Sequence, residues 1–247
     1  MESRYEHNKM VTHVNRVQDI RDMFVYKFKN RAFEDDGMLE LLGISFIADE
    51  DRIFGKPNEK YQQAELHWYN SMRCNTDKLQ EIYGMVPAIW QDAANSKGSV
   101  NSNYGYLVHS ALNGSQFDNV YRELKKNPNS RRGTMIYTHP DMHQRHREHG
   151  KDDFVCTNAV TYYIKECMLY AVVQMRSNDV VFGYMNDLYW QKAIQAKLAG
   201  ELMIKSGTIM WQVQSLHVYP RHHKLIEEYI KPVDYAMDTL DIGAHDG

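Results

Sequence analysis

Two β-like segments joined by a very short break place the strongest constraint on the fold of this chain. Residues 154–164 and 168–176 are both rich in β-branched and aromatic side chains, and only a short polar break separates them. So short a connection favours an antiparallel hairpin. A hairpin centred on Glu166 places Cys156 opposite Arg176, although a slip of one residue in register would put the two side chains on opposite faces.

The pairing matters because a guanidinium beside a thiol stabilises the thiolate. It predicts a lowered pKa for Cys156 and makes this thiol the first candidate nucleophile. The alternative is structural, since a free cysteine is commonly a small buried hydrophobe. Cys74 and Cys167 have no such predicted neighbour, and the lack of any CxxC spacing favours reduced thiols in a cytoplasmic protein.

Further strands and helices are expected around this hairpin. Alternating or β-branched stretches predict strands, and apolar spacing near 3.6 residues predicts helices. The expected strands are 38–48, 134–138 and 208–219, and the expected helices are 58–73, 187–202 and 221–230. This order predicts an α/β or α+β fold around a mixed sheet. Without repeats or low-complexity linkers, residues 1–247 are expected to form one domain, with a polar N-terminal segment 1–37 and a soft tail from about Val233.

One expected helix carries a carboxyl group on its apolar stripe. Tyr61, Glu65, Trp68 and Met72 follow one another at i, i+4, i+7 and i+11, which is one helical face. Burial of the Glu65 carboxylate would cost several kcal/mol unless the group is paired or protonated. The other interpretation places Glu65 at the edge of the stripe, in contact with solvent, and the pattern alone does not choose between them.

Composition and charge exclude several classes of function. Hydrophobic residues make up 43% and charged residues 25% of the chain, as in an ordinary globular protein. A net charge of −3 offers no strong basic field for nucleic acid, so no direct nucleic-acid partner is expected. No apolar run reaches the ~18 residues of a membrane span, and the N-terminus lacks the apolar core of a signal peptide. GxSxG, GxGxxG and Walker motifs are absent.

Two polar clusters could bind a ligand, although a solvent-exposed surface is the simpler explanation for each. Histidines at 139, 143, 146 and 149 have spacings that suit a metal site, but the surrounding cations favour a solvated loop, so no metal is expected. Arg131 and Arg132 follow turn residues and would bind a phosphate bidentately. A surface pair without a ligand is the commoner arrangement for two such arginines.

Several longer motifs resemble those of a known protein family. The chain carries SRR at 130–132, a cysteine about 25 residues later, RSND at 176–179, a glycine four residues on, and HVY at 217–219. These motifs follow one another in the order and spacing of the thymidylate synthase superfamily. Residues 38–225 resemble this superfamily, and five stretches resemble its bacteriophage deoxycytidylate hydroxymethylase branch. These stretches are NSNYG (101–105), SRRGTMIYT (130–138), FVCTN (154–158), MRSNDVVFGYMND (175–187) and SLHVYPRH (215–222).

The resemblance implies a fold, a reaction and an assembly. The fold is a three-layer α/β (α+β) subunit whose mixed sheet packs against that of a second copy in a homodimer. The substrates are dCMP and 5,10-methylenetetrahydrofolate, and the products are 5-hydroxymethyl-dCMP and tetrahydrofolate. The expected location is the cytoplasm, which for a phage protein is that of the host cell. Alternatives are a dUMP hydroxymethylase, a thymidylate synthase, a CMP hydroxymethylase or a non-catalytic nucleotide- or RNA-binding homologue.

The resemblance also implies roles for individual residues. In the catalytic set, Cys156 adds to C6 of the pyrimidine, Glu65 organises water and proton transfer, and Tyr104 and Asp187 complete the site. The implied substrate-binding residues are Arg176, Ser177 and Asn178, the sugar-binding pair His217 and Tyr219, and Arg131 and Arg132 reaching the phosphate from the other subunit. The implied folate-binding residues are Asp179, Trp90 near the reacting carbon, and Gly183.

Two positions depart from the synthase pattern. The synthase has histidine after its cysteine, where this chain has Thr157, and it has asparagine at the position of Asp187. Cytosine presents an N3 acceptor and an N4 amino donor, whereas uracil presents an N3–H donor and an O4 acceptor. A carboxyl group accepts from the amino group, and a proton on N3 or on the carboxyl completes a second bond. Asp187 therefore predicts selection of cytosine and argues against dUMP as the substrate.

Overall fold

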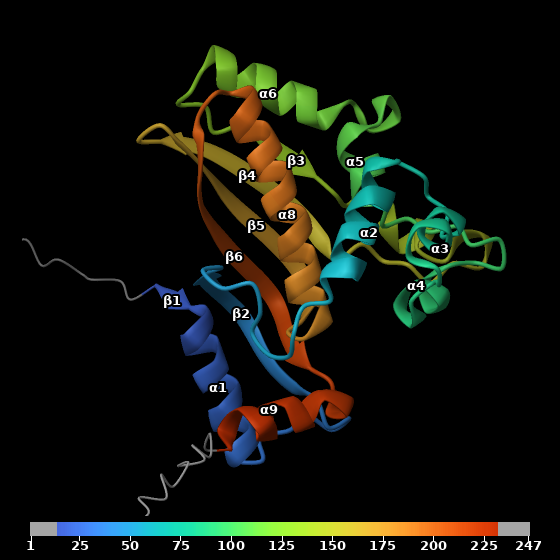
Figure 1. Ribbon diagram of the computed structural model, residues 1–247, viewed down its shortest axis with the longest axis vertical. Coiled ribbons are helices and arrows are strands. Elements are labelled where there is room, and N and C mark those ends of the chain that lie inside the picture. The colour runs from blue at the N-terminus through green and yellow to red at the C-terminus, as the bar shows by residue number, and fades with distance from the viewer. Residues whose placement is uncertain (1–13, 232–247) are drawn as a thin grey trace, which may run out of the picture.

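The computed structural model describes residues 14–231, and its framework is a six-stranded mixed sheet (Figure 1). The strand order is β1-β2-β6-β5-β4-β3. The strands are β1 (Asn15–Arg16), β2 (Leu39–Ile47), β3 (Thr134–Ile136), β4 (Thr157–Lys165), β5 (Met168–Asp179) and β6 (Lys205–Val218). The pairs β1–β2 and β5–β6 are parallel and the other three are antiparallel. The expected mixed α/β architecture is confirmed.

The described residues also form α-helices, which turns and loops connect to the strands. They are α1 (Val17–Lys29), α2 (Glu59–Asn70), α3 (Asp77–Tyr83), α4 (Ala88–Ala93), α5 (Tyr104–His109), α6 (Gln116–Lys126), α7 (Met142–Arg145), α8 (Phe182–Glu201) and α9 (His223–Ile230). The long helix α8 lies across the central strands, with α2 and α5 beside it (Figure 1). None of the helices within residues 14–231 is both long and apolar enough to cross a membrane.

The hairpin of β4 and β5 forms as predicted, with one correction. Its two turn residues, Glu166 and Cys167, have φ values of 50° and 57°, and the strand pairs next to them lie one residue out of the predicted register. An irregularity between Thr157 and Ala159 then restores the predicted pairing. The Arg176 N–H accordingly donates to the Cys156 carbonyl at 2.9 Å.

Helix α8 begins five residues before the predicted start at Asp187. The reason is a capping contact that the apolar spacing does not report. The Asp179 carboxylate accepts a hydrogen bond from the Phe182 N–H at 2.8 Å, and a second from the Gly183 N–H at 3.4 Å. A carboxylate at a helix N-terminus satisfies unpaired N–H groups and complements the helix dipole.

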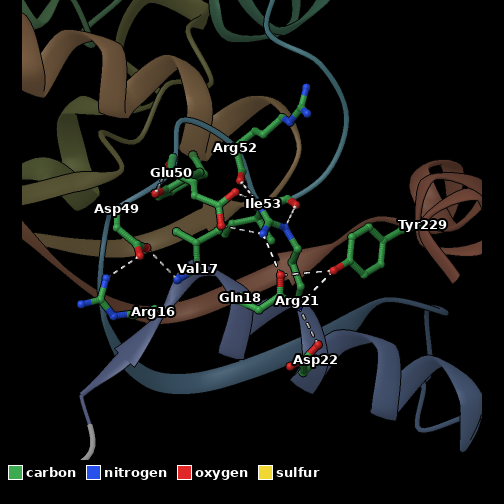
Figure 2. Close-up of polar contacts among 11 residues, drawn as sticks. Arg16, Val17, Gln18, Arg21, Asp22, Asp49, Glu50, Arg52, Ile53 and Tyr229 are labelled. Carbon is green, nitrogen blue, oxygen red and sulfur yellow. Dashed lines mark hydrogen bonds and ion pairs between the residues drawn. The ribbon is translucent and has the colours of Figure 1, made fainter.

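The other strand and helix predictions are confirmed within a few residues at their ends, and several helices were not predicted individually. The polar N-terminal segment contains α1, which buries Val17, Ile20 and Phe24. A buried arginine, Arg21, joins this helix to the loop after β2 and to Glu50 (Figure 2). Residues 1–13 and the expected soft tail lie outside the described residues.

The two faces of the sheet differ in burial. On β5 and β6, Val173 and Trp211 are fully buried in the core between the sheet and its helices. On the opposite face, Val172 and Met210 are paired neighbours and only half-buried, and Gln174 is exposed. One face of the subunit therefore presents a largely uncovered, partly apolar strand surface.

Candidate active site

The cysteine and arginine of the hairpin meet as the sequence predicts. The Arg176 guanidinium lies 3.6 Å from the Cys156 Sγ. It also donates to the carbonyls of Val155 at 3.0 Å and Phe154 at 2.6 Å, and lies over the Phe154 ring at 4.6 Å. The backbone and ring of the segment before the cysteine thus hold the guanidinium beside the sulfur.

The predicted lowering of the Cys156 pKa is wrong. Burial raises the pKa of the Cys156 thiol to about 11, and the nearby Arg176 charge opposes this increase without overcoming it. Asp187 and Asp153 add smaller effects in the same direction as burial. Formation of the thiolate therefore requires a proton acceptor or a change in the local charge.

Glu65 lies inside the protein, which decides between the two interpretations of its helical stripe. Only 6% of its surface is exposed, and burial raises its pKa to about 7. Tyr61, one turn earlier on α2, donates its hydroxyl proton to Glu65, and the Trp90 indole N–H donates to the same carboxyl oxygen at 3.1 Å. With a pKa near neutrality, this group can both accept and release a proton.

A second carboxyl group, on the half-buried Asp187 of α8, lies within electrostatic range of Glu65. Burial, followed by the charge of Glu65, raises the pKa of Asp187 to about 8. The Asn178 amide donates to Asp187 Oδ2 at 2.8 Å, and the Trp211 indole N–H donates to the Asn178 amide oxygen at 3.2 Å. Asp187 is therefore held as a neutral acid at neutral pH, beside an amide whose orientation is fixed.

Tyr104 connects Asp187 to Thr157, the residue that follows Cys156 and begins β4. It begins α5, where the Asn103 side chain caps the helix, and its ring is almost fully buried. The Thr157 hydroxyl donates to the Tyr104 hydroxyl at 3.0 Å. Asp187 and Cys156 both raise the pKa of Tyr104 electrostatically, after the larger effect of burial. The four predicted catalytic residues thus lie in one site, with Glu65 and Tyr104 buried and Cys156 and Asp187 half-buried.

The predicted sugar-binding residues line a hollow beside this site. His217 and Tyr219 lie at the end of β6 with their rings in edge-to-face contact at 4.8 Å. Together with Ser177 they line a cavity of about 340 Å³, whose other walls include Asp36 and Ser215. The cavity is large enough for part of a nucleotide and opens next to the Arg176 strand.

Asp179 offers a polar atom without a partner. One of its oxygens caps α8, whereas Oδ1 is buried with no hydrogen-bonding partner among the described residues. At Gly183 an added Cβ would lie 3.0 Å from the Asn178 amide nitrogen, so only glycine fits without a shift. A buried free acceptor suits the N–H groups of a pterin ring, and these two residues therefore fit the folate that the sequence implies.

The two turn arginines lie apart from this site. Arg131 and Arg132 are exposed at the connection between α6 and β3. The Arg132 guanidinium is paired with Glu123 at 2.9 Å, while Arg131 has no polar partner within residues 14–231. Within one chain the structure does not bring them to the cavity of His217 and Tyr219.

The histidine-rich stretch forms the short helix α7 and the turn after it. The rings of His143 and His146 each contact the Phe154 ring at 5.2 Å. No group of three or more potential metal-binding side chains converges within the described part of the chain.

Sequence reasoning missed three residues of the site. Tyr61 was assigned only to an apolar stripe, although its i, i+4 spacing to Glu65 is the signal for the bond between them. Trp211 lies on β6, and nothing in its local sequence pattern indicates its bond to Asn178. Gly105 follows Tyr104 because an added Cβ would lie 1.8 Å from the Tyr69 carbonyl oxygen.

Comparison with known proteins identifies relatives of the whole chain. The deoxycytidylate 5-hydroxymethyltransferase of Enterobacteria phage T4 is 43% identical over 243 residues, which cover 94% of this chain and 98% of that protein. The enzyme of the same name from Enterobacteria phage T6 is 43% identical over 233 residues, 90% of this chain and 94% of that protein.

A solved structure supports the same fold. The thermostable thymidylate synthase A from Bacillus subtilis superposes with a TM-score of 0.65 at 20% identity, covering 87% of this chain and 83% of that one. The thymidylate synthase family matches residues 57–246. This protein therefore belongs to the thymidylate synthase family.

Proposed function

We propose that this protein transfers a one-carbon unit from 5,10-methylenetetrahydrofolate to C5 of dCMP, with addition of water, giving 5-hydroxymethyl-dCMP and tetrahydrofolate. The observation that carries the proposal is the carboxyl group of Asp187, whose pKa is raised to about 8, within electrostatic range of Cys156. A neutral carboxyl group can donate to the cytosine N3 and accept from its N4 amino group. The names of the phage relatives support the same reaction.

The first step of the proposed mechanism is covalent. The Cys156 sulfur adds to C6 of the pyrimidine, which makes C5 a carbon nucleophile. Since the pKa of the thiol is about 11, its proton must leave as the bond forms, and Arg176 stabilises the developing thiolate. C5 then bonds to the methylene carbon of the folate, and a proton leaves C5.

The second half of the mechanism assigns a role to Glu65. Loss of tetrahydrofolate leaves an exocyclic methylene on C5, and addition of water to that carbon gives the hydroxymethyl group. Return of an electron pair then expels the cysteine. Glu65, with a pKa of about 7 and hydrogen bonds from Tyr61 and Trp90, positions this water and takes its proton.

The remaining assignments are proposed on the same basis. Ser177, His217 and Tyr219 line the cavity that would hold the sugar, and Arg176 would contact the phosphate. Asp179 and Gly183 would hold the pterin ring, close to Trp90. Arg131 and Arg132 would complete the phosphate site from a second subunit.

A homodimer is proposed from the uncovered face of the sheet. Val172 and Met210 on this face are only half-buried in the isolated subunit. Packing of this face against its equivalent in a second copy would bury them, as an isologous interface does. The same association would give the exposed Arg131 an anion to bind.

The direct test is product analysis with three nucleotides. The protein is incubated with 5,10-methylenetetrahydrofolate and dCMP, CMP or dUMP, and the products are weighed by mass spectrometry. We expect dCMP to gain the mass of one CH2O unit. A gain of only CH2 would indicate methylation, and reaction of dUMP alone would exclude the proposed substrate.

Two variants test the residues that carry the proposal. Cys156→Ser should reduce turnover to below about one thousandth of wild type while leaving the fold intact. Asp187→Asn should reduce the preference for dCMP over dUMP about a hundredfold or more, because the amide matches uracil. A fully active serine variant would refute the covalent step, and an unchanged preference would remove Asp187 from base recognition.

A further inference from the structure

We propose that Thr157 is a positioning residue that directs the Tyr104 hydroxyl proton onto Asp187 and thereby fixes the face that the acid presents to the base. The inference rests on the proposed function, because it assumes that Asp187 contacts cytosine. Thr157, the residue that follows Cys156, would then contribute to the selection of cytosine over uracil.

The argument starts from the ambiguity of a neutral carboxyl group. With its O–H towards N3 and its C=O towards N4, the acid matches cytosine. Turned over, it accepts from the N3–H of uracil and donates to O4, so it matches the wrong base equally well. A neutral Asp187 therefore discriminates between the bases only if its two oxygens are held in fixed roles.

Asn178 holds one side of the carboxyl group. Its amide nitrogen donates to Asp187 Oδ2 at 2.8 Å, and its amide oxygen accepts from the Trp211 indole N–H at 3.2 Å. Because an indole N–H can only donate, the Asn178 amide cannot turn over without losing this bond. Asp187 Oδ2 consequently always faces a donor on this side.

Tyr104 on α5 lies beside the carboxyl group, and the hydrogen bond from Thr157 determines the direction of the Tyr104 hydroxyl proton. A tyrosine hydroxyl has one proton to donate. Burial raises the pKa of Asp187, and the hydrogen bond from Tyr104 opposes this increase, as donation to the ionised form does. The Tyr104 oxygen must then accept, and the Thr157 hydroxyl lies 3.0 Å away with its oxygen as the donor atom.

The surroundings of Thr157 leave its hydroxyl little choice of partner. The residue is fully buried at the start of β4. Besides Tyr104, the only polar atom that it meets in the described structure is the Met175 sulfur at 3.2 Å, which is a weak acceptor. Hydrogen bonds therefore run from Thr157 to Tyr104 and on to Asp187, and they meet the bond from Asn178 at the same carboxyl group.

The consequence lies in the direction of the acid proton. With donors on both flanks, the proton of Asp187 has no acceptor in either residue, and it points to the side where N3 of the base would lie. Without the Thr157 hydroxyl, Tyr104 is free to rotate its own proton away and accept from Asp187. The turned-over acid then becomes accessible, and uracil gains relative to cytosine.

The test compares binding of the two nucleotides. We measure the Kd of dCMP and of dUMP by titration calorimetry for wild type, Thr157→Val and Thr157→Ser, and then the kcat/KM for dCMP. Thr157→Val, which removes the hydroxyl at similar shape, should reduce the dCMP-to-dUMP affinity ratio about tenfold. Thr157→Ser, which retains the hydroxyl, should keep the ratio within about threefold of wild type.

A merely structural role for Thr157 gives a different pattern. Loosened packing would weaken both nucleotides equally and leave the ratio unchanged, and that result would overturn the proposal. The proposal would also be overturned if Thr157→Ser reduced the dCMP-to-dUMP affinity ratio as much as Thr157→Val does. Where Thr157→Val does not fold, Thr157→Ala takes its place with the same expected loss.

A double variant tests whether Thr157 acts through Tyr104. Tyr104→Phe should itself reduce the ratio, and adding Thr157→Val to it should have no further effect, because the acceptor is already gone. Additive losses would contradict the proposal. If wild-type protein neither binds nor converts dCMP, the proposed function fails; if it does both and Thr157→Val keeps the ratio, only the present inference fails.

Discussion

Glu65 and Asp187 place two acidic side chains in one site, where Glu65 is buried and Asp187 is half-buried. Burial is the largest cause of the raised pKa of each, and the charge of Glu65 raises the pKa of Asp187 further. Two neighbouring carboxyls cannot both be ionised cheaply in such surroundings. In the proposed reaction, Asp187, which has the higher pKa, would keep its proton for the base, and Glu65 would exchange protons with water.

Burial of Asp187 also has a cost for stability. Its pKa in the folded protein is about 8, against an ordinary value of 3.8, so the folded state binds a proton that the unfolded state releases between these values. The free energy of unfolding therefore falls as the pH rises from about 4 to about 8, because the unfolded state gains from ionising Asp187 and the folded state does not. We expect Asp187→Asn to raise the melting temperature by several degrees at pH 8 and to flatten the decline of stability from pH 5 to pH 8.

A matched control uses an exposed carboxylate. Asp92 lies on α4 with its side chain in solvent, and Asp92→Asn should change the unfolding free energy by less than about 0.5 kcal/mol at either pH. Thermal unfolding monitored by circular dichroism at the two pH values measures both variants. Equal pH dependence of wild type and Asp187→Asn would show that Asp187 is not buried as a neutral acid.

The residue scale shows where a sequence pattern stops being informative. The pairing of Cys156 with Arg176 could be predicted from the hairpin, but the sign of the pKa shift could not. Local sequence identifies the neighbouring charge, whereas the opposing effect is burial by distant elements. Similarly, the helical stripe places Tyr61 next to Glu65, but Trp90 reaches the same oxygen from a separate helix that the sequence did not predict.

At the scale of elements, the contact between α2 and α5 depends on one glycine. An added Cβ at Gly105 would lie 1.8 Å from the Tyr69 carbonyl oxygen, so α5 would have to move away from α2 and would displace Tyr104. We expect Gly105→Ala to reduce the unfolding free energy by about 2–4 kcal/mol and to weaken nucleotide binding. Urea unfolding and calorimetric titration with dCMP provide the two measurements.

Gly200 in α8 provides the comparison for Gly105. No atom lies within 4 Å of a Cβ added at this position. Gly200→Ala should stabilise the protein by up to about 1 kcal/mol, since alanine is favoured over glycine inside a helix. If both glycine variants behaved alike, the close approach of α2 and α5 would not be the cause.

The attachment of α1 depends on a buried arginine that bridges this helix and the loop after β2 (Figure 2). Arg21 donates to the carbonyls of Ile53 at 2.6 Å and Arg52 at 2.7 Å, and pairs with Glu50. Arg21→Met would leave two carbonyls without their donor, and we expect a loss of about 2–4 kcal/mol in unfolding free energy by urea titration.

The control for Arg21 is an exposed ion pair on α9. Lys224 has 80% of its side chain exposed and lies 3.6 Å from Glu228. Lys224→Ala should cost less than about 0.5 kcal/mol, as surface pairs do. An equally small loss for Arg21→Met would mean that the bridge contributes nothing beyond a surface contact.

Elements with strong periodic patterns could be located from the sequence, and their exact ends could not. Both strands of the central hairpin were predicted, but the bulge between Thr157 and Ala159, where the Tyr137 N–H donates to the Asn158 carbonyl at 2.9 Å, leaves no local signal. The early start of α8 depends on a capping bond from Asp179, three residues before the helix. Short helices such as α4 have too few turns to show a period.

At the scale of the whole molecule, the proposed dimer predicts that active sites are shared. Cys156→Ser lacks the nucleophile, and Arg131→Ala with Arg132→Ala lacks the phosphate contacts from the partner. Each pure dimer should be nearly inactive. Mixing the two variants forms hybrid dimers with one intact site each, and about a quarter of wild-type activity should return.

Two measurements accompany the mixing experiment. Sedimentation equilibrium should give twice the chain mass for wild type, and Val172→Asp on the uncovered face should shift the population towards monomers. Activity of the mixture no greater than the sum of its separate components would exclude sites shared across an interface.

The overall architecture was predictable to the extent that family motifs extend along the chain. The order of strands and helices and the gathering of Cys156, Arg176 and Asp187 follow from those motifs. The burial that sets their pKa values depends on contacts among α2, α5, α8 and the sheet, which lie far apart in sequence. No local pattern contains that information, so the chemistry of the site became visible only in the folded structure.

The tip of the β4–β5 hairpin has a practical consequence for experiments on this protein. Its turn residue Cys167 is exposed, whereas burial raises the pKa of both Cys74 and Cys156 to about 11. Thiol reagents react with the thiolate, so a maleimide dye used briefly at neutral pH would attach to Cys167 at the hairpin tip and spare Cys156. A fluorescent reporter could thus be introduced without engineering a new cysteine or removing a native one.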